Sequence, residues 1–127
     1  VLDWSPTAID RFKERIPSFP VSHCHVGDFF THKGTYDIIV EQTFFCAIDP
    51  QLRQEYVRTI DNLLGKDGIW VALLFNTQFE HDGPPFGGSM EQYLDLFKAI
   101  FKELIIEEEP ASIEPRKGRE VFMIGRK

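Results

Sequence analysis

Three acidic residues each stand at the end of a short apolar segment, where they could bind a ligand. They are Asp3, Asp28 and Glu41, at the ends of the segments 1–2, 21–26 and 36–40. Ligands of open α/β sheets bind at the carboxyl ends of the strands, where an acidic residue accepts hydrogen bonds from ribose hydroxyls. The pattern alone favours an exposed carboxylate at the strand end for Asp3, with a ribose contact as the alternative. Asp28 could accept a hydrogen bond from an adenine amino group, or it could belong to a simple Gly-Asp turn.

Aromatic residues follow two of these carboxylates directly. Phe29 follows Asp28 and could cover an adenine ring, or it could pack in the core. Phe44 and Phe45 come shortly after Glu41 and could wall a small apolar cavity. Packing of both rings in the core fits the same pattern equally well.

The stretch 36–50, YDIIVEQTFFCAIDP, predicts the strand that positions these groups. It begins as a continuous apolar run and turns polar at Glu41-Gln42-Thr43. Such runs are typical of strands buried on both faces in a parallel sheet. We therefore expect residues 36–41 to form the central strand and the floor of a site, with Glu41 lining it.

The remaining elements predict an α/β fold with a mostly parallel sheet. Residues 69–75, IWVALLF, form a second continuous apolar run and predict a parallel strand beside the first. The other expected helices are 6–16, 50–64 and a segment beginning after Ser89, and the other strands are 21–26, 104–108 and 121–124. The last two strands are expected to form an antiparallel pair, with the polar loop 110–118 between them.

The segment 76–89 is irregular and contains Gly83-Pro84-Pro85-Phe86 and two further glycines. The prolines stiffen its middle, and the glycines permit hinges beside them. Loops at the carboxyl edge of a sheet are natural lids over a binding site. The segment is therefore predicted to be a lid, with a plain surface loop as the alternative.

The composition argues against several classes of protein. The chain has 127 residues and a net charge of −6, which supports one domain over residues 1–127 and no nucleic-acid or membrane partner. The two cysteines, Cys24 and Cys46, indicate a reducing, cytoplasmic setting. His23 and His25 share one face of an expected strand, but a structural zinc site needs four ligands, so no metal site is predicted.

In combination, YDIIVEQTFFCAIDP and GPPF resemble the thiopurine S-methyltransferase family, and most closely its thiol and halide methyltransferase branch. The resemblance covers nearly the whole chain, and it implies a Rossmann-like class I methyltransferase fold with a doubly wound sheet. It implies S-adenosylmethionine as cofactor and a small thiol, thiopurine, halide or thiocyanate as methyl acceptor. Methyl transfer of this kind needs positioning more than acid-base groups, so no catalytic residue is predicted.

The resemblance also implies site residues. The cofactor contacts would be Asp3, Trp4, Asp28, Phe29, Glu41 and Thr43. The acceptor contacts would be Phe44, Phe45, Pro85 and Phe86. Thiopurine enzymes tend to carry Arg-Gly where this chain has Gln42-Thr43, so direct transfer of thiopurine recognition does not follow.

The chain begins at Val1-Leu2-Asp3 and contains no glycine-rich loop of the G-x-G type. In the family, a first strand, that loop and a first helix precede this point. We therefore expect an N-terminally truncated member that binds the cofactor weakly or not at all. Two other classes remain open: a non-catalytic remnant acting by interaction, and another nucleotide-binding α/β enzyme such as a dehydrogenase.

Overall fold

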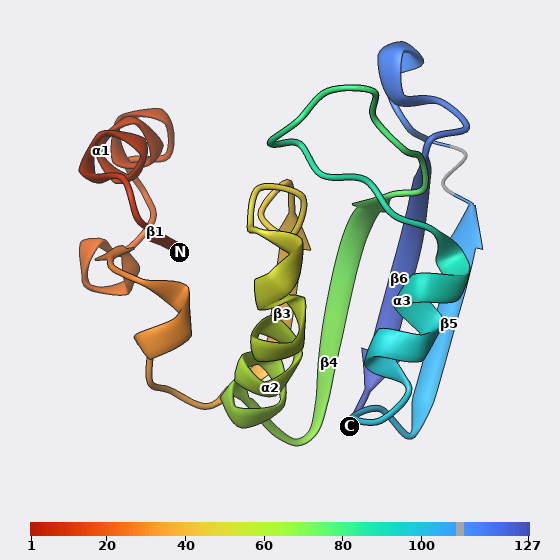
Figure 1. Cartoon of the computed structure of the whole chain (residues 1–127). Helices are drawn as coiled ribbons and strands as arrows, with labels where there is room; N and C mark the ends of the chain where they lie inside the picture. The colour runs from red at the N-terminus through yellow and green to blue at the C-terminus, as the bar shows by residue number, and fades with distance from the viewer. Residues whose placement is uncertain (109–110) are drawn as a thin grey trace. The chain divides into compact units, whose positions relative to one another are not determined.

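A computed structural model describes residues 1–108 and 111–127 of the chain (Figure 1). The chain forms two compact units, Val1–Gly34 and Thr35–Lys127, and each is described by itself. The expected loop 110–118 begins at Pro110, which lies outside the described residues. None of the helices among the described residues is long and apolar enough to cross a membrane.

The first unit pairs two very short parallel strands beside one helix. Strand β1 (Leu2–Asp3) pairs with β2 (His25–Val26), and α1 (Pro6–Arg15) connects them. Ser5 caps α1 by accepting a hydrogen bond from the Ala8 amide, as expected from its position before Pro6. The prediction of a strand over 21–26 is wrong for its first half. Residues Val21–His23 form a 3₁₀ turn instead, because Pro20 leads directly into it and offers its carbonyl to the His23 amide.

The second unit is a four-stranded sheet in the order β3-β4-β6-β5. Its strands are β3 (Tyr36–Gln42), β4 (Leu64–Phe75), β5 (Glu103–Glu108) and β6 (Glu120–Arg126). Strands β3 and β4 are parallel, whereas β6 runs antiparallel to both β4 and β5. The expected parallel pair and the antiparallel C-terminal pair are therefore both confirmed.

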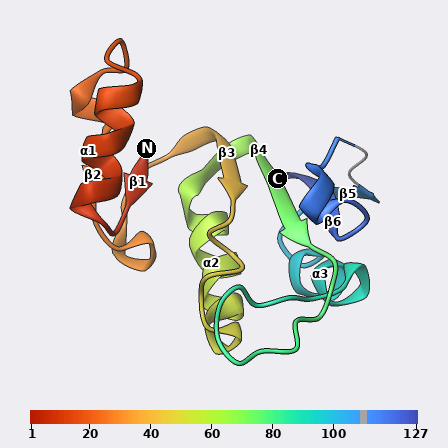
Figure 2. The ribbon, with the colours of Figure 1, turned by 90° about the horizontal axis from the view of Figure 1, so that it is seen from above.

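Helices α2 (Arg53–Leu63) and α3 (Met90–Phe97) cover the same face of this sheet (Figures 1 and 2). Ser89 caps α3 in a capping box with Gln92, in agreement with the expected helix start. The core beneath the helices is aromatic: the Trp70 ring of β4 stacks on Phe97 of α3 with ring centroids 4.3 Å apart. The Trp70 indole also donates a hydrogen bond to the Tyr56 hydroxyl of α2.

The prediction that residues 36–41 form a central strand buried on both faces is wrong for this chain. Strand β3 is the edge of the four-stranded sheet and has one neighbour, β4, among the described residues. Ile38 is 58% exposed and Val40 74% exposed, on the face opposite α2 and α3. A continuous apolar run indicates that both faces of a strand can be buried. It contains no information on how many neighbouring strands pair with the two edges of that strand.

Candidate functional site

The chain turns sharply after β3, and Glu41 holds that turn. Thr43 has φ +67°, a backbone conformation that non-glycine residues rarely adopt. The Oε1 atom of Glu41 accepts hydrogen bonds from the amides of Phe44 at 2.8 Å and Phe45 at 2.9 Å. The Ala47 amide then closes the turn on the Phe44 carbonyl.

The other carboxyl oxygen of Glu41, Oε2, is buried and has no hydrogen-bond partner among the described residues. Burial raises the pKa of the Glu41 carboxyl, against the opposing effect of the two amide hydrogen bonds. The pKa values of Cys46, Tyr56 and Tyr93 are raised mainly by their own burial, and the charge of Glu41 raises them further. Glu41 is thus an interior residue, and the predicted contact between Glu41 and cofactor stays a prediction.

Glu41 should make stability depend on pH in a defined direction. Its pKa in the folded chain lies above the ordinary 4.5, so its contribution to stability is full below that value and is lost as pH rises through the folded pKa. We expect the wild-type chain to lose free energy of unfolding, relative to Glu41→Gln, over this window. Urea unfolding of both chains at a series of pH values measures the difference. Parallel curves would contradict a raised pKa.

The two phenylalanines after Glu41 have different surroundings. Phe45 is 1% exposed and packs its ring edge against the rings of Tyr56 and Tyr93. Phe44 is 37% exposed. Phe45 therefore packs in the core, which was the alternative to a role in walling a cavity. Neither Phe44 nor Phe45 is among the residues that line the pocket described below.

The second half of the loop of residues 76–89 is held by two backbone hydrogen bonds. One goes to the turn after β3 and the other to the first residues of the loop itself. The Phe86 amide donates to the Cys46 carbonyl at 2.7 Å, and the Gly88 amide donates to the Thr77 carbonyl at 3.0 Å. A Cβ atom on Gly87 would lie 1.8 Å from the Thr77 carbonyl oxygen, so only glycine fits there. The loop thus has a specific attachment, as a lid over a site would need.

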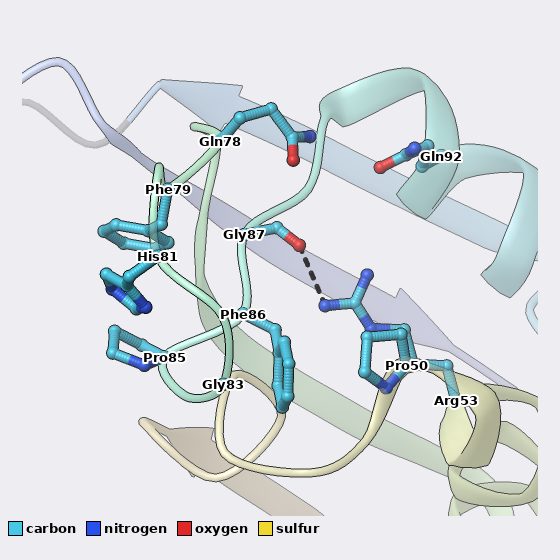
Figure 3. A pocket seen from close by; sticks show the side chains of 10 residues that line it. All are labelled: Pro50, Arg53, Gln78, Phe79, His81, Gly83, Pro85, Phe86, Gly87 and Gln92. Carbon is cyan, nitrogen blue, oxygen red and sulfur yellow. Dashed lines mark hydrogen bonds between the residues drawn. The ribbon is translucent and has the colours of Figure 1, made fainter.

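A pocket of about 260 Å³ lies beneath this loop (Figure 3). Its lining residues are Pro50, Arg53, Gln78, Phe79, His81, Gly83, Pro85, Phe86, Gly87 and Gln92. The rings of Phe79, His81 and Pro85 lie on the left in Figure 3, Arg53 lies on the right, and Phe86 lies between them. Two of the predicted acceptor contacts, Pro85 and Phe86, therefore line a pocket that is also lined by the cationic side chain of Arg53.

Arg53 is a pocket residue that no sequence motif singled out. Its side chain is half-buried, and its Nη2 donates to the Gly87 carbonyl at 2.8 Å. Its guanidinium lies 4.7 Å from the Phe45 ring centroid, and burial lowers the pKa of the group. The Nε atom is buried without a hydrogen-bond partner among the described residues. One sequence signal was present: a cation on the first residue of a helix opposes the helix dipole, which suggests another role for it.

Four of the residues predicted to contact the cofactor belong to the first unit and lie at the carboxyl ends of β1 and β2. They are Asp3, Trp4, Asp28 and Phe29. The Gly27 amide donates to the Asp3 carbonyl at 3.0 Å, which sets the two strand ends side by side. Asp3 and Asp28 each use Oδ1 to accept a local amide, from Ser5 and Phe30 respectively. Trp4 is 74% exposed, and Phe29 follows Asp28 in a 3₁₀ turn.

This arrangement fits the nucleoside part of S-adenosylmethionine. Two carboxylates can accept hydrogen bonds from hydroxyl and amino groups, and two aromatic rings can cover a base. The donor set does not suit a metal. Within residues 1–108 and 111–127, no group of three or more His, Cys, Asp or Glu side chains could hold a metal ion.

The fold is shared with solved structures of methyltransferases. The N-methyltransferase NodS from Bradyrhizobium japonicum aligns with a TM-score of 0.75 at 16% identity, over 100% of this chain and 71% of that one. A TehB-like methyltransferase from Corynebacterium glutamicum aligns with a TM-score of 0.66 at 19% identity, over 99% of this chain and 66% of that one. The expected Rossmann-like methyltransferase fold is confirmed.

The family follows from the sequence comparisons. The family model described as Thiopurine S-methyltransferase (TPMT) matches residues 2–124. Thiocyanate methyltransferase 1 of Brassica oleracea is 33% identical over 125 residues, which cover 94% of this chain and 55% of that protein. The thiopurine S-methyltransferase of Vibrio parahaemolyticus is 35% identical over 75 residues, which cover 58% of this chain and 35% of that protein. The chain belongs to the thiopurine S-methyltransferase family, as the resemblance implied, and it spans about half the length of the plant relative.

Proposed function

We propose that this protein takes part in methyl transfer from S-adenosylmethionine to a small, soft, anionic acceptor such as thiocyanate, a thiolate or a halide. The observation that carries the proposal is the pocket under the loop 76–89, where one half-buried cation faces aromatic and proline rings. The family match over residues 2–124 and the names of the plant relatives, thiocyanate and thiol methyltransferases, support it.

The first unit would hold the nucleoside part of the cofactor. Asp3 and Asp28 would accept hydrogen bonds from it, and the exposed ring of Trp4 and the ring of Phe29 would cover the base. When bound, S-adenosylmethionine supplies an activated methyl group on a cationic sulfur. Glu41 and Thr43 stay predicted contacts, with Oε2 as the oxygen of Glu41 that no amide uses.

The pocket would bind and partly dehydrate the acceptor. Arg53 supplies a half-buried positive charge at the pocket, and a charge-assisted hydrogen bond from its guanidinium would hold an anion there. The rings of Phe86 and Phe79 exclude water from the same space. Dehydration makes an anion a better nucleophile, and the fixed cation keeps it bound in spite of that cost.

The ionisable groups behind the pocket are not suited to act as bases near neutral pH. Burial raises the pKa of Tyr93 to about 12 and raises the pKa of the Cys46 thiol. Both groups keep their protons near neutral pH, so neither of them would deprotonate an acceptor. Thiocyanate and halide anions are already ionised at any ordinary pH and need no such base.

Calorimetric titration of the chain with S-adenosylhomocysteine tests the cofactor part of the proposal. Stoichiometric binding that Trp4→Ala weakens would support it. Absence of binding by a chain that circular dichroism shows to be folded would contradict this part of the proposal, and it would agree with the expectation that a chain without a glycine-rich loop binds the cofactor weakly or not at all. A methyl-transfer assay with thiocyanate and a small thiol then tests the reaction.

Arg53→Gln should weaken anion binding about 10- to 100-fold, since hydrogen bonds to charged groups contribute about 1.5–3 kcal/mol. The measurement is a thiocyanate titration followed by amide NMR shifts, with sulfate, a hard and strongly hydrated anion, keeping the ionic strength constant. Arg58→Gln, which removes an exposed arginine of the same helix, is the matched control and should change nothing. Equal affinities of wild type and Arg53→Gln would contradict an anion site at Arg53.

We also propose a cytoplasmic location, supported by the two free cysteines, Cys24 and Cys46. Nucleic acid is not a proposed partner, because the net charge is −6.

A further inference from the structure

Two of the attachments of the pocket loop depend on the turn that follows β3. In the first, the Cys46 carbonyl accepts the Phe86 amide. In the second, the Phe45 ring supports the Arg53 guanidinium, which donates to the Gly87 carbonyl. Moving the turn would therefore move both of these points of attachment.

The turn itself has little backbone support at its start. The amides of Phe44 and Phe45 lie beyond the β3–β4 ladder, which ends with the pairing of Gln42 and Leu73. Both amides donate instead to one atom, Oε1 of Glu41. Phe45 is 1% exposed, so its amide would lie unpaired in the interior without that atom, at a cost of about 1–3 kcal/mol.

We propose that Glu41 is a positioning residue for the pocket: it fixes the turn of residues 43–47 and, through that turn, the loop of residues 76–89. Glu41 does not line the pocket and lies on the strand rather than on the loop. Its effect passes through the Phe86–Cys46 hydrogen bond and the Arg53–Gly87 hydrogen bond. The effect on turnover rests on the proposed function, whereas the effect on the loop does not.

Three substitutions of Glu41 distinguish a role of its hydrogen-bond acceptor from a role of its negative charge. One side-chain oxygen accepts both amides, so Glu41→Gln can keep the contact, whereas Glu41→Leu removes the acceptor at similar volume. Glu41→Asp keeps the charge but shortens the side chain by one methylene group, which withdraws the oxygen from the amides. A role of the negative charge predicts that Asp substitutes for Glu and Gln does not. A positioning role predicts the reverse.

Amide hydrogen exchange of the full chain tests the proposal without any ligand. In Glu41→Leu we expect the Phe86 amide to exchange at least tenfold faster than in wild type, while the Met123 amide in β6, between β4 and β5, keeps its rate. Glu41→Gln should restore wild-type exchange at Phe86. Unchanged exchange in Glu41→Leu, or equal acceleration in Glu41→Gln and Glu41→Leu, would overturn the proposal.

If Glu41→Leu does not fold, the comparison of Glu41→Asp with Glu41→Gln decides. Faster exchange at Phe86 in the Asp variant alone supports the positioning role, and the opposite order or no difference overturns it. The thiocyanate titration adds a functional readout. If Arg53→Gln has no effect on a chain whose loop responds to Glu41, the proposed function fails while the positioning role stands.

Discussion

Gly87→Ala is expected to detach the pocket loop and to abolish measurable anion binding. The added Cβ would lie 1.8 Å from the carbonyl oxygen of Thr77, and that oxygen is a backbone atom with no rotamer to change. The loop must move to accommodate the methyl group, which would break the adjacent hydrogen bond from Gly88 to Thr77 and the one from Arg53 to Gly87. Overpacking of this kind costs about 1–3 kcal/mol, and we expect a loss of stability in that range.

Limited proteolysis combined with urea unfolding measures both consequences. In Gly87→Ala we expect cleavage within residues 76–89 to accelerate at least tenfold. Gly27→Ala is a control for stability and cleavage with the same chemical change, because its Cβ would meet only the Leu2 side chain, at 3.7 Å. Wild-type cleavage and stability in Gly87→Ala would show that the loop accommodates a methyl group and is not tightly attached.

Trp70→Ala is expected to produce the largest loss of stability of any single substitution considered. Trp70 is 0% exposed, stacks on Phe97 and Phe101, and donates to the Tyr56 hydroxyl. Removal of a buried tryptophan side chain costs about 3–5 kcal/mol. This is a large share of the roughly 5–15 kcal/mol that stabilise a typical domain, so the variant should unfold at a much lower urea concentration than wild type.

The second tryptophan of the chain is the natural control. Trp4 is 74% exposed, so Trp4→Ala should change the free energy of unfolding by no more than about 0.5 kcal/mol. Urea unfolding followed by circular dichroism compares the two variants. Similar unfolding midpoints would contradict the assignment of Trp70 to the core. The proposed function further predicts that Trp4→Ala weakens binding of S-adenosylhomocysteine.

Local signals in the sequence were sufficient for the starts of two helices and for the direction of the strands. Ser5-Pro6 and Ser89 start helices because a side-chain oxygen next to an amide acts within a few residues. The runs 36–40 and 69–75 pair as parallel strands because continuous apolar segments joined by a helix suit that geometry. The family resemblance rested on residues contiguous in the chain, and the match over residues 2–124 confirms it.

The direction of individual side chains depended on contacts between distant segments. Arg53 turns into the pocket because the Gly87 carbonyl, 34 residues later, accepts its hydrogen bond, and helical periodicity contains no information about that carbonyl. Phe45 turns into the core while Phe44 stays partly exposed, because the positive φ of Thr43 reverses the chain between strand and turn. The edge position of β3 likewise reflects which strands are present to pair with it. Sequence patterns report which residues can be buried, and the partners that bury or orient them are decided by tertiary packing.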